Sequence, residues 1–196
     1  SAIQTKVVLS KNLTERFLES LHLGIFVALA FMAYMPEGGH DALSTHLYVP
    51  NFVLKHDLWH YDITQMIYST LPLTIDFFYS FFASTGEIGL RIVNVFFTIA
   101  SACYLYQFAL RISGDKVLSL LASLSFLSSP LTIFVSSSLF IEPIFSFFCI
   151  AFVVEFYYFF VIQKSISYPR RFLLTVLPAG VVIASKLNGL IILAVI

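Results

Sequence analysis

Long apolar stretches alternate with short polar segments along the chain. The apolar stretches cover residues 17–35, 89–110, 117–140, 143–162 and 172–196. Most approach the roughly 20 residues that an α-helix needs to cross the apolar core of a bilayer. They are apolar on nearly every face, whereas the strands of a membrane barrel alternate apolar and polar positions. The pattern therefore predicts an all-α, polytopic transmembrane helix bundle with about five spans.

One further apolar segment, residues 71–84, is too short to cross and contains Pro72 and Asp76. If it crossed, the later basic groups would face outward, against the excess of Lys and Arg that cytoplasmic loops carry. Those groups are Arg111, Lys116, Lys164, Arg170 and Arg171. We therefore expect 71–84 to form an interfacial, non-spanning helix.

The same charge rule orients the chain. Lys6, Lys11 and Arg16 precede the first span, which places the N-terminus in the cytoplasm and the following loop, residues 36–88, outside. That loop holds six of the eleven acidic residues and four of the five histidines, and Glu142 returns to the same face. The polar chemistry is therefore expected on the external side of the membrane.

Composition supports a membrane protein and excludes one class of partner. The chain is 59% hydrophobic and 11% charged, against about 25% charged residues in soluble domains. Membrane lipids are therefore partners. The formal net charge is zero and no basic cluster is interleaved with aromatic residues, so we expect no nucleic-acid partner. Cys103 and Cys149 both fall inside predicted spans and indicate no redox compartment.

Asp41 is the first candidate for catalysis, because it lies in the first polar loop after an apolar segment. A carboxylate there could take a proton from an acceptor hydroxyl or hold a cation. A solvated loop acid or a helix cap is the alternative interpretation.

A set of residues resembles the GT-C superfamily of membrane glycosyltransferases. The set is Asp41-Ala42-Leu43-Ser44-Thr45-His46-Leu47 with Pro50, then Tyr68-Ser69-Thr70-Leu71-Pro72-Leu73, Asp76, Tyr79, Gly86 and Arg91. The pattern is similar to bacterial enzymes akin to protein O-mannosyltransferases and to the aminoarabinose transferases that modify lipid A. The resemblance extends over residues 15–196 and is specific from 39 to 91.

The resemblance implies a transferase that moves a sugar from a polyprenyl or dolichyl phosphate to the hydroxyl of a lipid, glycan or protein. Asp41 would activate that hydroxyl for an inverting displacement, and juxtamembrane helices would lie in the first loop. Many relatives have an acid pair where this chain has Asp41-Ala42, and Glu142 stands where a second external Asp is expected. No cofactor is assigned, and use of a divalent cation stays open. Residues 1–196 would be the N-terminal part of a GT-C-like domain whose remainder is absent, in a bacterial inner membrane.

Two cations are candidates to bind the phosphate of the donor. Lys186 interrupts the last apolar stretch, where an unpaired cation costs about 2.5–3.5 kcal/mol. It could instead extend to the interface. Arg91 begins a span and could instead pair with Glu87 one turn earlier.

Glu142 also has an alternative interpretation. It could be an acid at the start of a helix, where the helix dipole stabilises a negative charge.

His46 and Tyr68 belong to the resembling pattern and are expected to contact substrate. His56 and His60 have the i, i+4 spacing of metal ligands, but no third ligand accompanies them at a diagnostic spacing, so no metal site is expected. Two other functions stay open. A transporter or flippase would use Lys186 at a broken helix near the bilayer midplane, and a non-catalytic scaffold would keep only the fold.

Overall fold

The computed structural model describes residues 2–39, 42–56, 74–162 and 168–186. Within these ranges the ordered elements are helices and turns, without a strand, which confirms the all-α prediction. In chain order they are α1 (Ala2–Met32), the π-helical turn η1 (Ala42–His46), α2 (Tyr48–His56), α3 (Thr74–Ser80), the 3-10 turn η3 (Ala83–Thr85), α4 (Gly86–Ser113), α5 (Lys116–Leu127), α6 (Pro130–Ser136), α7 (Glu142–Tyr157), the π-helical turn η4 (Tyr158–Ile162) and α8 (Tyr168–Ser185).

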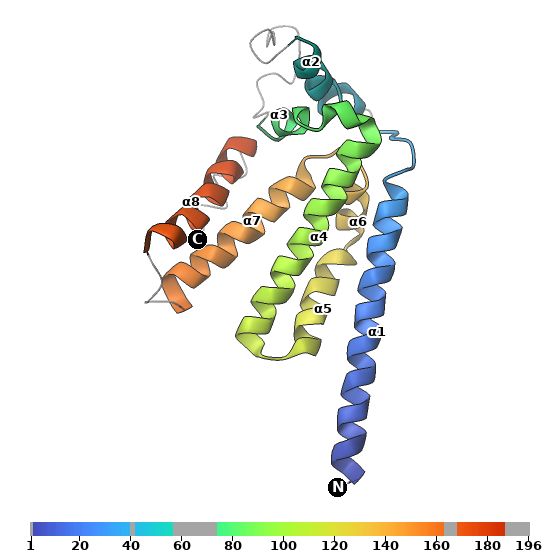
Figure 1. Cartoon of the computed structure of the whole chain (residues 1–196), viewed down its shortest axis with the longest axis vertical. Helices are drawn as coiled ribbons and strands as arrows, with labels where there is room; N and C mark the ends of the chain where they lie inside the picture. Colours follow the sequence, from blue (N-terminus) through green and yellow to red (C-terminus); the bar gives the residue numbers. More distant parts are fainter. Residues whose placement is uncertain (1, 40–41, 57–73, 163–167, 187–196) are drawn as a thin grey trace.

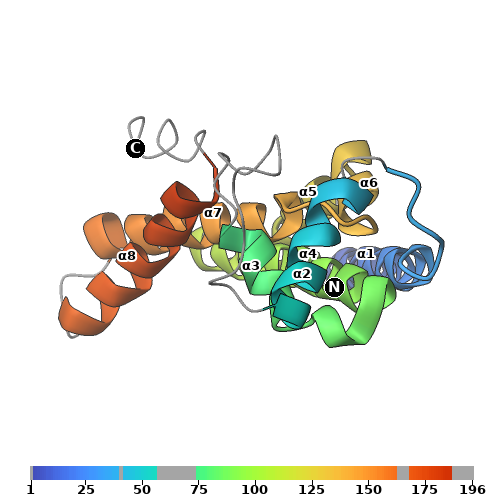
Figure 2. The ribbon, with the colours of Figure 1, turned by 90° about the horizontal axis from the view of Figure 1, so that it is seen from above.

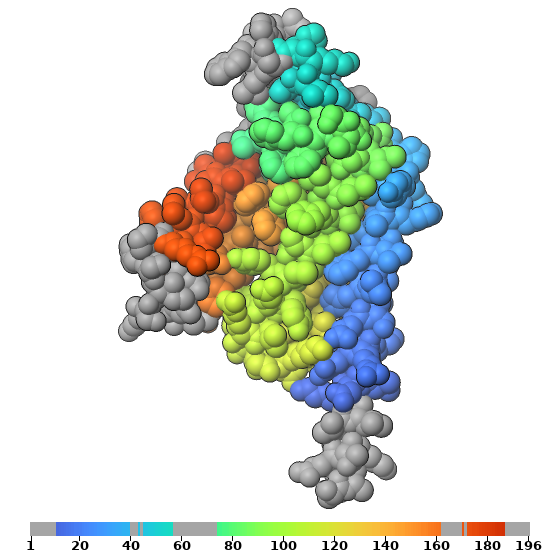
Figure 3. Space-filling model, viewed as in Figure 1, coloured from blue at the N-terminus to red at the C-terminus, as the bar shows by residue number. Residues whose placement is uncertain are grey.

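The long helices run side by side and the short ones gather at one end. α4 packs against α5 and α7, α7 packs against α8, and α1 packs mainly against α5. Figure 1 shows α2 and α3 above the upper ends of α4 and α7, and Figure 2 shows α1 and α8 on opposite sides of the molecule. In Figure 3 α4 lies between the surface of α1 and that of α8, with α2 and α3 at the top. We call this top the capped end.

Two helices are long and apolar enough to cross a membrane, Ala83–Ser113 and Glu142–Val161. They confirm the predicted spans at 89–110 and 143–162. Residues 17–32 of the first predicted span lie in α1, but Glu15, Arg16 and Glu19 precede or interrupt its apolar part, and α1 does not meet the same requirement. The last predicted span is described as far as a shorter apolar helix, Phe172–Ser185.

The predicted span 117–140 is wrong as a single helix. The structure breaks it into α5 and α6, which are bent by 64°. Pro130 begins α6, and proline disfavours the helical conformation in the residue before it. Ser129 accordingly has an extended backbone, with φ −61° and ψ 126°. The two helices can still form one broken span.

The turn between α4 and α5 lies at the end opposite to the capped end (Figure 1). Gly114 ends α4 in the left-handed conformation, with φ 65°, and its N–H donates to the carbonyl of Leu110. Asp115 then caps α5, because its carboxylate accepts from the N–H groups of Val117 and Leu118. These backbone bonds lower the pKa of Asp115. A two-residue connection therefore makes α4 and α5 antiparallel neighbours.

The described part of segment 71–84 confirms the non-spanning prediction. α3 has seven residues, a length of about 10 Å, which is a third of the apolar thickness of a bilayer. α2 has nine residues and is also too short to cross. Both helices lie in the long connection between α1 and α4, where juxtamembrane helices were expected.

Large apolar side chains cover the outside of the long helices. Phe17, Phe31, Phe96, Phe134 and Phe160 are each at least 58% exposed. So many large apolar side chains at the surface are unusual for a soluble monomer. Lipid chains around the bundle would cover this surface, as they do in an integral membrane protein.

Candidate functional site

A compact apolar cluster holds α3 against the main bundle at the capped end. Ile75 and Tyr79 of α3 are buried together with Leu90 of α4, Leu139, and Ile144 of α7. Apolar residues at i and i+4 lie on one face of a helix, so Ile75 and Tyr79 turn the same face of α3 inward. Any polar group on the neighbouring faces of α3 is thereby fixed relative to the start of α7.

Glu142 and Lys186, two of the predicted site residues, form an ion pair. The Nζ of Lys186 donates to the Oε1 of Glu142 over 2.8 Å. Glu142 begins α7, and Lys186 directly follows the last residue of α8, where the helix dipole favours a cation. Glu142 is therefore the anion that offsets the cost of placing the charge of Lys186 in an apolar segment.

The second oxygen of Glu142 has a different environment. Oε2 is buried and has no hydrogen-bond partner among the residues that the structure describes. A buried carboxylate oxygen without a donor costs free energy, and such groups often mark places where a ligand binds. The Nζ of Lys186 lies 6.0 Å from the ring centre of Phe145 and can make three hydrogen bonds, one of which goes to Glu142.

His46, a third predicted site residue, pairs with Asp76. Its Nδ1 lies 2.5 Å from the Oδ1 of Asp76, whose side chain is 1% exposed. Because an ionised carboxylate only accepts hydrogen bonds, Nδ1 carries the proton in this contact. The contact fixes the orientation of the ring and leaves Nε2 as the nitrogen for a second partner.

Tyr79 and Asn94 connect α3 to the segment before Glu142. The Tyr79 hydroxyl donates to the Oδ1 of Asn94 and lies 2.9 Å from the carbonyl oxygen of Phe140. The Nδ2 of Asn94 donates to the carbonyls of Ser138 and Phe140. Burial raises the pKa of Tyr79 well above its ordinary value, and the negative charges of Asp76 and Glu142 add to that shift. The hydroxyl therefore stays protonated and remains a donor.

Tyr79→Phe is expected to lower the free energy of unfolding by about 1–3 kcal/mol, because the buried Oδ1 of Asn94 then loses its donor. The measurement is thermal unfolding of the purified protein in one detergent. Tyr34→Phe is the control, since Tyr34 is 64% exposed and should leave the melting temperature unchanged. Equal melting temperatures for Tyr79→Phe and the wild type would contradict the expectation.

Three contacts bring these groups into one site. Tyr79 lies on α3 with Asp76, and its hydroxyl is 2.9 Å from the carbonyl oxygen of Phe140. The His46 ring packs edge-on against Phe140, two residues before Glu142. On the other side, the hydroxyl of Thr74, two residues before Asp76, donates to the carbonyl of Ala184, two residues before Lys186. The two pairs, Glu142 with Lys186 and His46 with Asp76, therefore lie at the capped end, and we call them the polar site.

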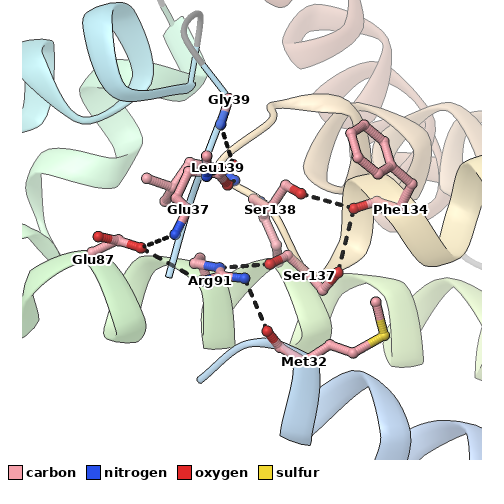
Figure 4. A network of polar contacts seen from close by, with 11 residues as sticks. Met32, Glu37, Gly39, Glu87, Arg91, Phe134, Ser137, Ser138 and Leu139 are labelled. Carbon is pink, nitrogen blue, oxygen red and sulfur yellow. Dashed lines mark hydrogen bonds and ion pairs between the residues drawn. The ribbon is translucent and has the colours of Figure 1, made fainter. Parts of the chain in front are cut away.

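Arg91 has a different environment from the one expected of a phosphate ligand. Its side chain is buried, and each of its three guanidinium nitrogens lies within hydrogen-bond distance of a protein oxygen. The Nε donates to the carbonyl of Ser137, the Nη2 donates to the carbonyl of Met32, and the Nη1 lies 3.4 Å from Glu87 (Figure 4). The alternative prediction, a pair with Glu87, is confirmed. The geometry favours a structural role for Arg91.

Two predicted site residues, Asp41 and Tyr68, lie outside the described residues, as does His60. His56 ends α2 and stacks on Phe52. Among the His, Cys, Asp and Glu residues that the structure describes, no three come together as a set of metal ligands.

The partners of these residues could hardly be predicted from the sequence. Asp76 had been noted as an acid in segment 71–84 and as part of the resembling pattern, Tyr79 stood only in that pattern, and Asn94 was not singled out. Asn94 interrupts an apolar helix, and polar residues inside membrane helices are rare and often paired. That signal could have identified Asn94. The contact with Phe140 could not be read in the same way, because it joins residues 46 positions apart.

A family model described as dolichyl-phosphate-mannose-protein mannosyltransferase matches residues 40–196. No curated protein and no solved structure gives a match. The matched range contains every residue of the polar site, and it confirms the resemblance to membrane glycosyltransferases. The match extends over most of the chain, which therefore belongs to the dolichyl-phosphate-mannose-protein mannosyltransferase family, a family of membrane glycosyltransferases.

Proposed function

We propose that the protein transfers mannose from a polyprenyl or dolichyl phosphate to a hydroxyl group of an acceptor protein, and that the reaction takes place at the polar site. The family supplies the sugar, the lipid phosphate and the class of acceptor. The observation that carries the proposal is the pair of Glu142 and Lys186 beside His46 and Asp76. The ammonium group of Lys186 and the free carboxylate oxygen of Glu142, which can accept a hydrogen bond, therefore lie at the same end of the bundle.

The chemistry needs a base for the acceptor and a positive charge for the leaving phosphate. The acceptor oxygen attacks the anomeric carbon of mannose with inversion, as in a GT-C enzyme, and its proton passes to the carboxylate of Asp41. The bond between that carbon and the phosphate oxygen breaks, and the electron pair leaves with the phosphate. Lys186 keeps two N–H donors for that phosphate after its bond to Glu142.

Glu142 and His46 would orient the substrates in this proposal. The buried Oε2 of Glu142 can accept a hydrogen bond from a hydroxyl of the sugar or of the acceptor protein. Such a bond would supply the donor that this oxygen lacks among the described residues. His46 offers Nε2 in an orientation that Asp76 fixes. Tyr68 would contribute a further substrate contact.

The distribution of charge supports a membrane orientation with the polar site on the external face. Basic residues outnumber acidic residues at the end opposite to the capped end. The basic residues there are Lys6, Lys11, Arg16, Arg111 and Lys116, and the acidic residues are Glu15, Glu19 and Asp115, with which Lys11 and Lys116 pair. An excess of basic residues marks cytoplasmic loops. We therefore propose a cytoplasmic N-terminus and an external reaction, with the inner membrane of a bacterium as the setting.

The transporter alternative receives less support. It requires Lys186 at a broken helix near the bilayer midplane. In the structure Lys186 contacts the first residue of α7, at the capped end and beside the short helices. That position suits chemistry at the membrane surface better than a transport pathway through the bundle.

The proposed function is tested by transfer of radiolabelled mannose from polyprenyl phosphate mannose to a peptide rich in Ser and Thr. The purified protein is placed in lipid nanodiscs, and the matching glucose donor is run beside it. Mannose on peptide hydroxyls, with little transfer from the glucose donor, is the expected result. Transfer only to lipid, or no transfer with either donor, would overturn the proposal.

Lys186→Met is expected to raise the KM for the donor by about 10- to 100-fold, because a hydrogen bond to a charged group contributes about 1.5–3 kcal/mol. Lys11→Met is the control, since Lys11 is a half-exposed lysine at the opposite end. Initial rates over a range of donor concentrations give the KM values.

A double variant separates the two roles of Lys186. Lys186→Met alone leaves Glu142 without its partner, so part of the defect could come from that uncompensated charge. Glu142→Gln combined with Lys186→Met removes both charges. The donor KM should stay high in the double variant. Its return to the wild-type value would mean that Lys186 serves only Glu142.

A further inference from the structure

Glu37 lies between α1 and η1, and both of its carboxylate oxygens accept hydrogen bonds from the backbone. Oε1 accepts from the N–H of Gly38 at 3.0 Å and from the N–H of Gly39 at 2.9 Å. Oε2 accepts from the N–H of Leu139 at 2.9 Å. Figure 4 shows Glu37 and Gly39 on one loop segment, with Leu139 on the turn beside it. One side chain therefore joins two segments that are 102 residues apart in the sequence.

The two segments lead to the two acids with proposed roles in catalysis. Gly39 precedes Asp41 by two residues, and Leu139 precedes Glu142 by three. Leu139 is completely buried and belongs to the cluster that holds α3. The turn is therefore anchored in the core, and Glu37 connects the beginning of the first loop to that anchor.

Glu37 is itself held in place through its backbone. Its N–H donates to the Oε1 of Glu87 at 2.9 Å, and the same oxygen faces the Nη1 of Arg91. Arg91 also donates to the carbonyl of Ser137, in the turn that contains Leu139. The chain at Glu37 thus has two attachments to one turn, one direct and one through Glu87 and Arg91 (Figure 4).

We propose that Glu37 is a positioning residue, whose carboxylate sets the place of the loop entry at 37–39 relative to the turn before Glu142. The catalytic part of this inference rests on the proposed function, because it concerns the geometry between the base and the rest of the site. The structural part, the link itself, stands on the contacts alone.

A carboxylate is required for this link. It has two acceptor oxygens and no donor, and here both oxygens face N–H groups. Glutamine has the same shape but only one acceptor oxygen, so its amide N–H would face a backbone N–H in either orientation. Aspartate keeps both acceptors but is one methylene shorter. Glu37→Gln is therefore the sharpest test, and Glu37→Asp should have an intermediate effect.

The first measurement is the steady-state rate of mannose transfer. Glu37→Gln is expected to lower kcat by about 10- to 100-fold, the effect of a misplacement of about 1 Å in a reacting group. The KM for the donor should change by less than about threefold, because Lys186 is untouched. Glu19→Gln is the matched control, since Glu19 pairs with Lys116 at the opposite end.

The second measurement does not depend on turnover. Spin labels are placed at Leu43 in η1 and at Leu118 in α5, which are both exposed, in a background where Cys103 and Cys149 are replaced by alanine. Pulsed electron paramagnetic resonance gives the distribution of distances between them. Glu37→Gln should broaden this distribution, whereas Glu19→Gln should leave it as in the wild type.

The two measurements separate the failure of the link from the failure of the proposed function. An unchanged distance distribution in folded Glu37→Gln overturns the inference, whatever the activity. A broadened distribution with an unchanged kcat overturns the positioning role. If the wild type transfers no mannose at all, the proposed function fails, and the distance distribution still decides whether Glu37 links the two segments.

Discussion

Asp41→Asn is expected to lower the rate of mannose transfer on the order of 10³-fold, because the amide cannot take the proton of the acceptor hydroxyl. Asp41 follows the 37–39 segment, which Glu37 ties to the turn before Glu142. The shape and volume of the side chain hardly change, so binding of the donor through Lys186 should be retained. Transfer to a peptide and binding of a labelled donor are measured on the same nanodisc preparation.

Asp115→Asn is the matched control for Asp41→Asn. Asp115 caps α5 at the opposite end of the molecule, and asparagine caps helices about as well as aspartate. The control should therefore fold and turn over like the wild type. Wild-type turnover in Asp41→Asn would remove Asp41 from the mechanism and leave Glu142 as the remaining candidate for the base.

A bell-shaped or sigmoid pH profile adds a second criterion. If Asp41 is the base, the wild-type rate should fall at acid pH as its carboxylate becomes protonated. The residual rate of Asp41→Asn should lose that acid limb. A limb that persists in the variant would belong to another group and would argue against Asp41.

The sequence predicted the helices best where no special backbone geometry intervened. α4 runs uninterrupted between Gly86 and Gly114, and both glycines have positive φ values that end regular structure there. The predicted span at 89–110 therefore differed from α4 only at its ends. The break before Pro130 could also have been predicted, because proline restricts the backbone of the residue before it. The prediction of a single span at 117–140 instead followed the continuous apolar run.

Several residues of the candidate site could be predicted from the sequence, but the partner that each of them contacts could not. Lys186 required an anion, and the charge argument stated that requirement without naming Glu142. The partner depends on α8 packing beside α7 through a tertiary contact between residues 44 positions apart. Likewise, Glu37 was only one of six loop acids. Its role follows from two backbone N–H groups and a distant turn, which leave no trace in the spacing of side-chain types.

Arg91→Leu is expected to lower the free energy of unfolding by about 3–5 kcal/mol, the cost of removing one partner from a buried charged network. Arg91 is 4% exposed. Its guanidinium joins the end of α1 at Met32, the turn after α6 at Ser137, and Glu87 of α4. Leucine would leave both carbonyls without this donor and Glu87 without its counter-charge, so the three elements would lose a common attachment.

The same variant distinguishes a structural role for Arg91 from the binding of the donor phosphate. If Arg91 bound the donor phosphate, its replacement would raise the donor KM while the melting temperature stayed the same. The structural role predicts the reverse, with a lower melting temperature and a nearly normal donor KM in the fraction that remains folded at low temperature. Arg16→Leu, an exposed arginine on α1, controls for loss of charge. Because Arg91 has no described contact in the polar site, whereas Lys186 pairs with Glu142 there, we expect the stability to fall and the donor KM to hold.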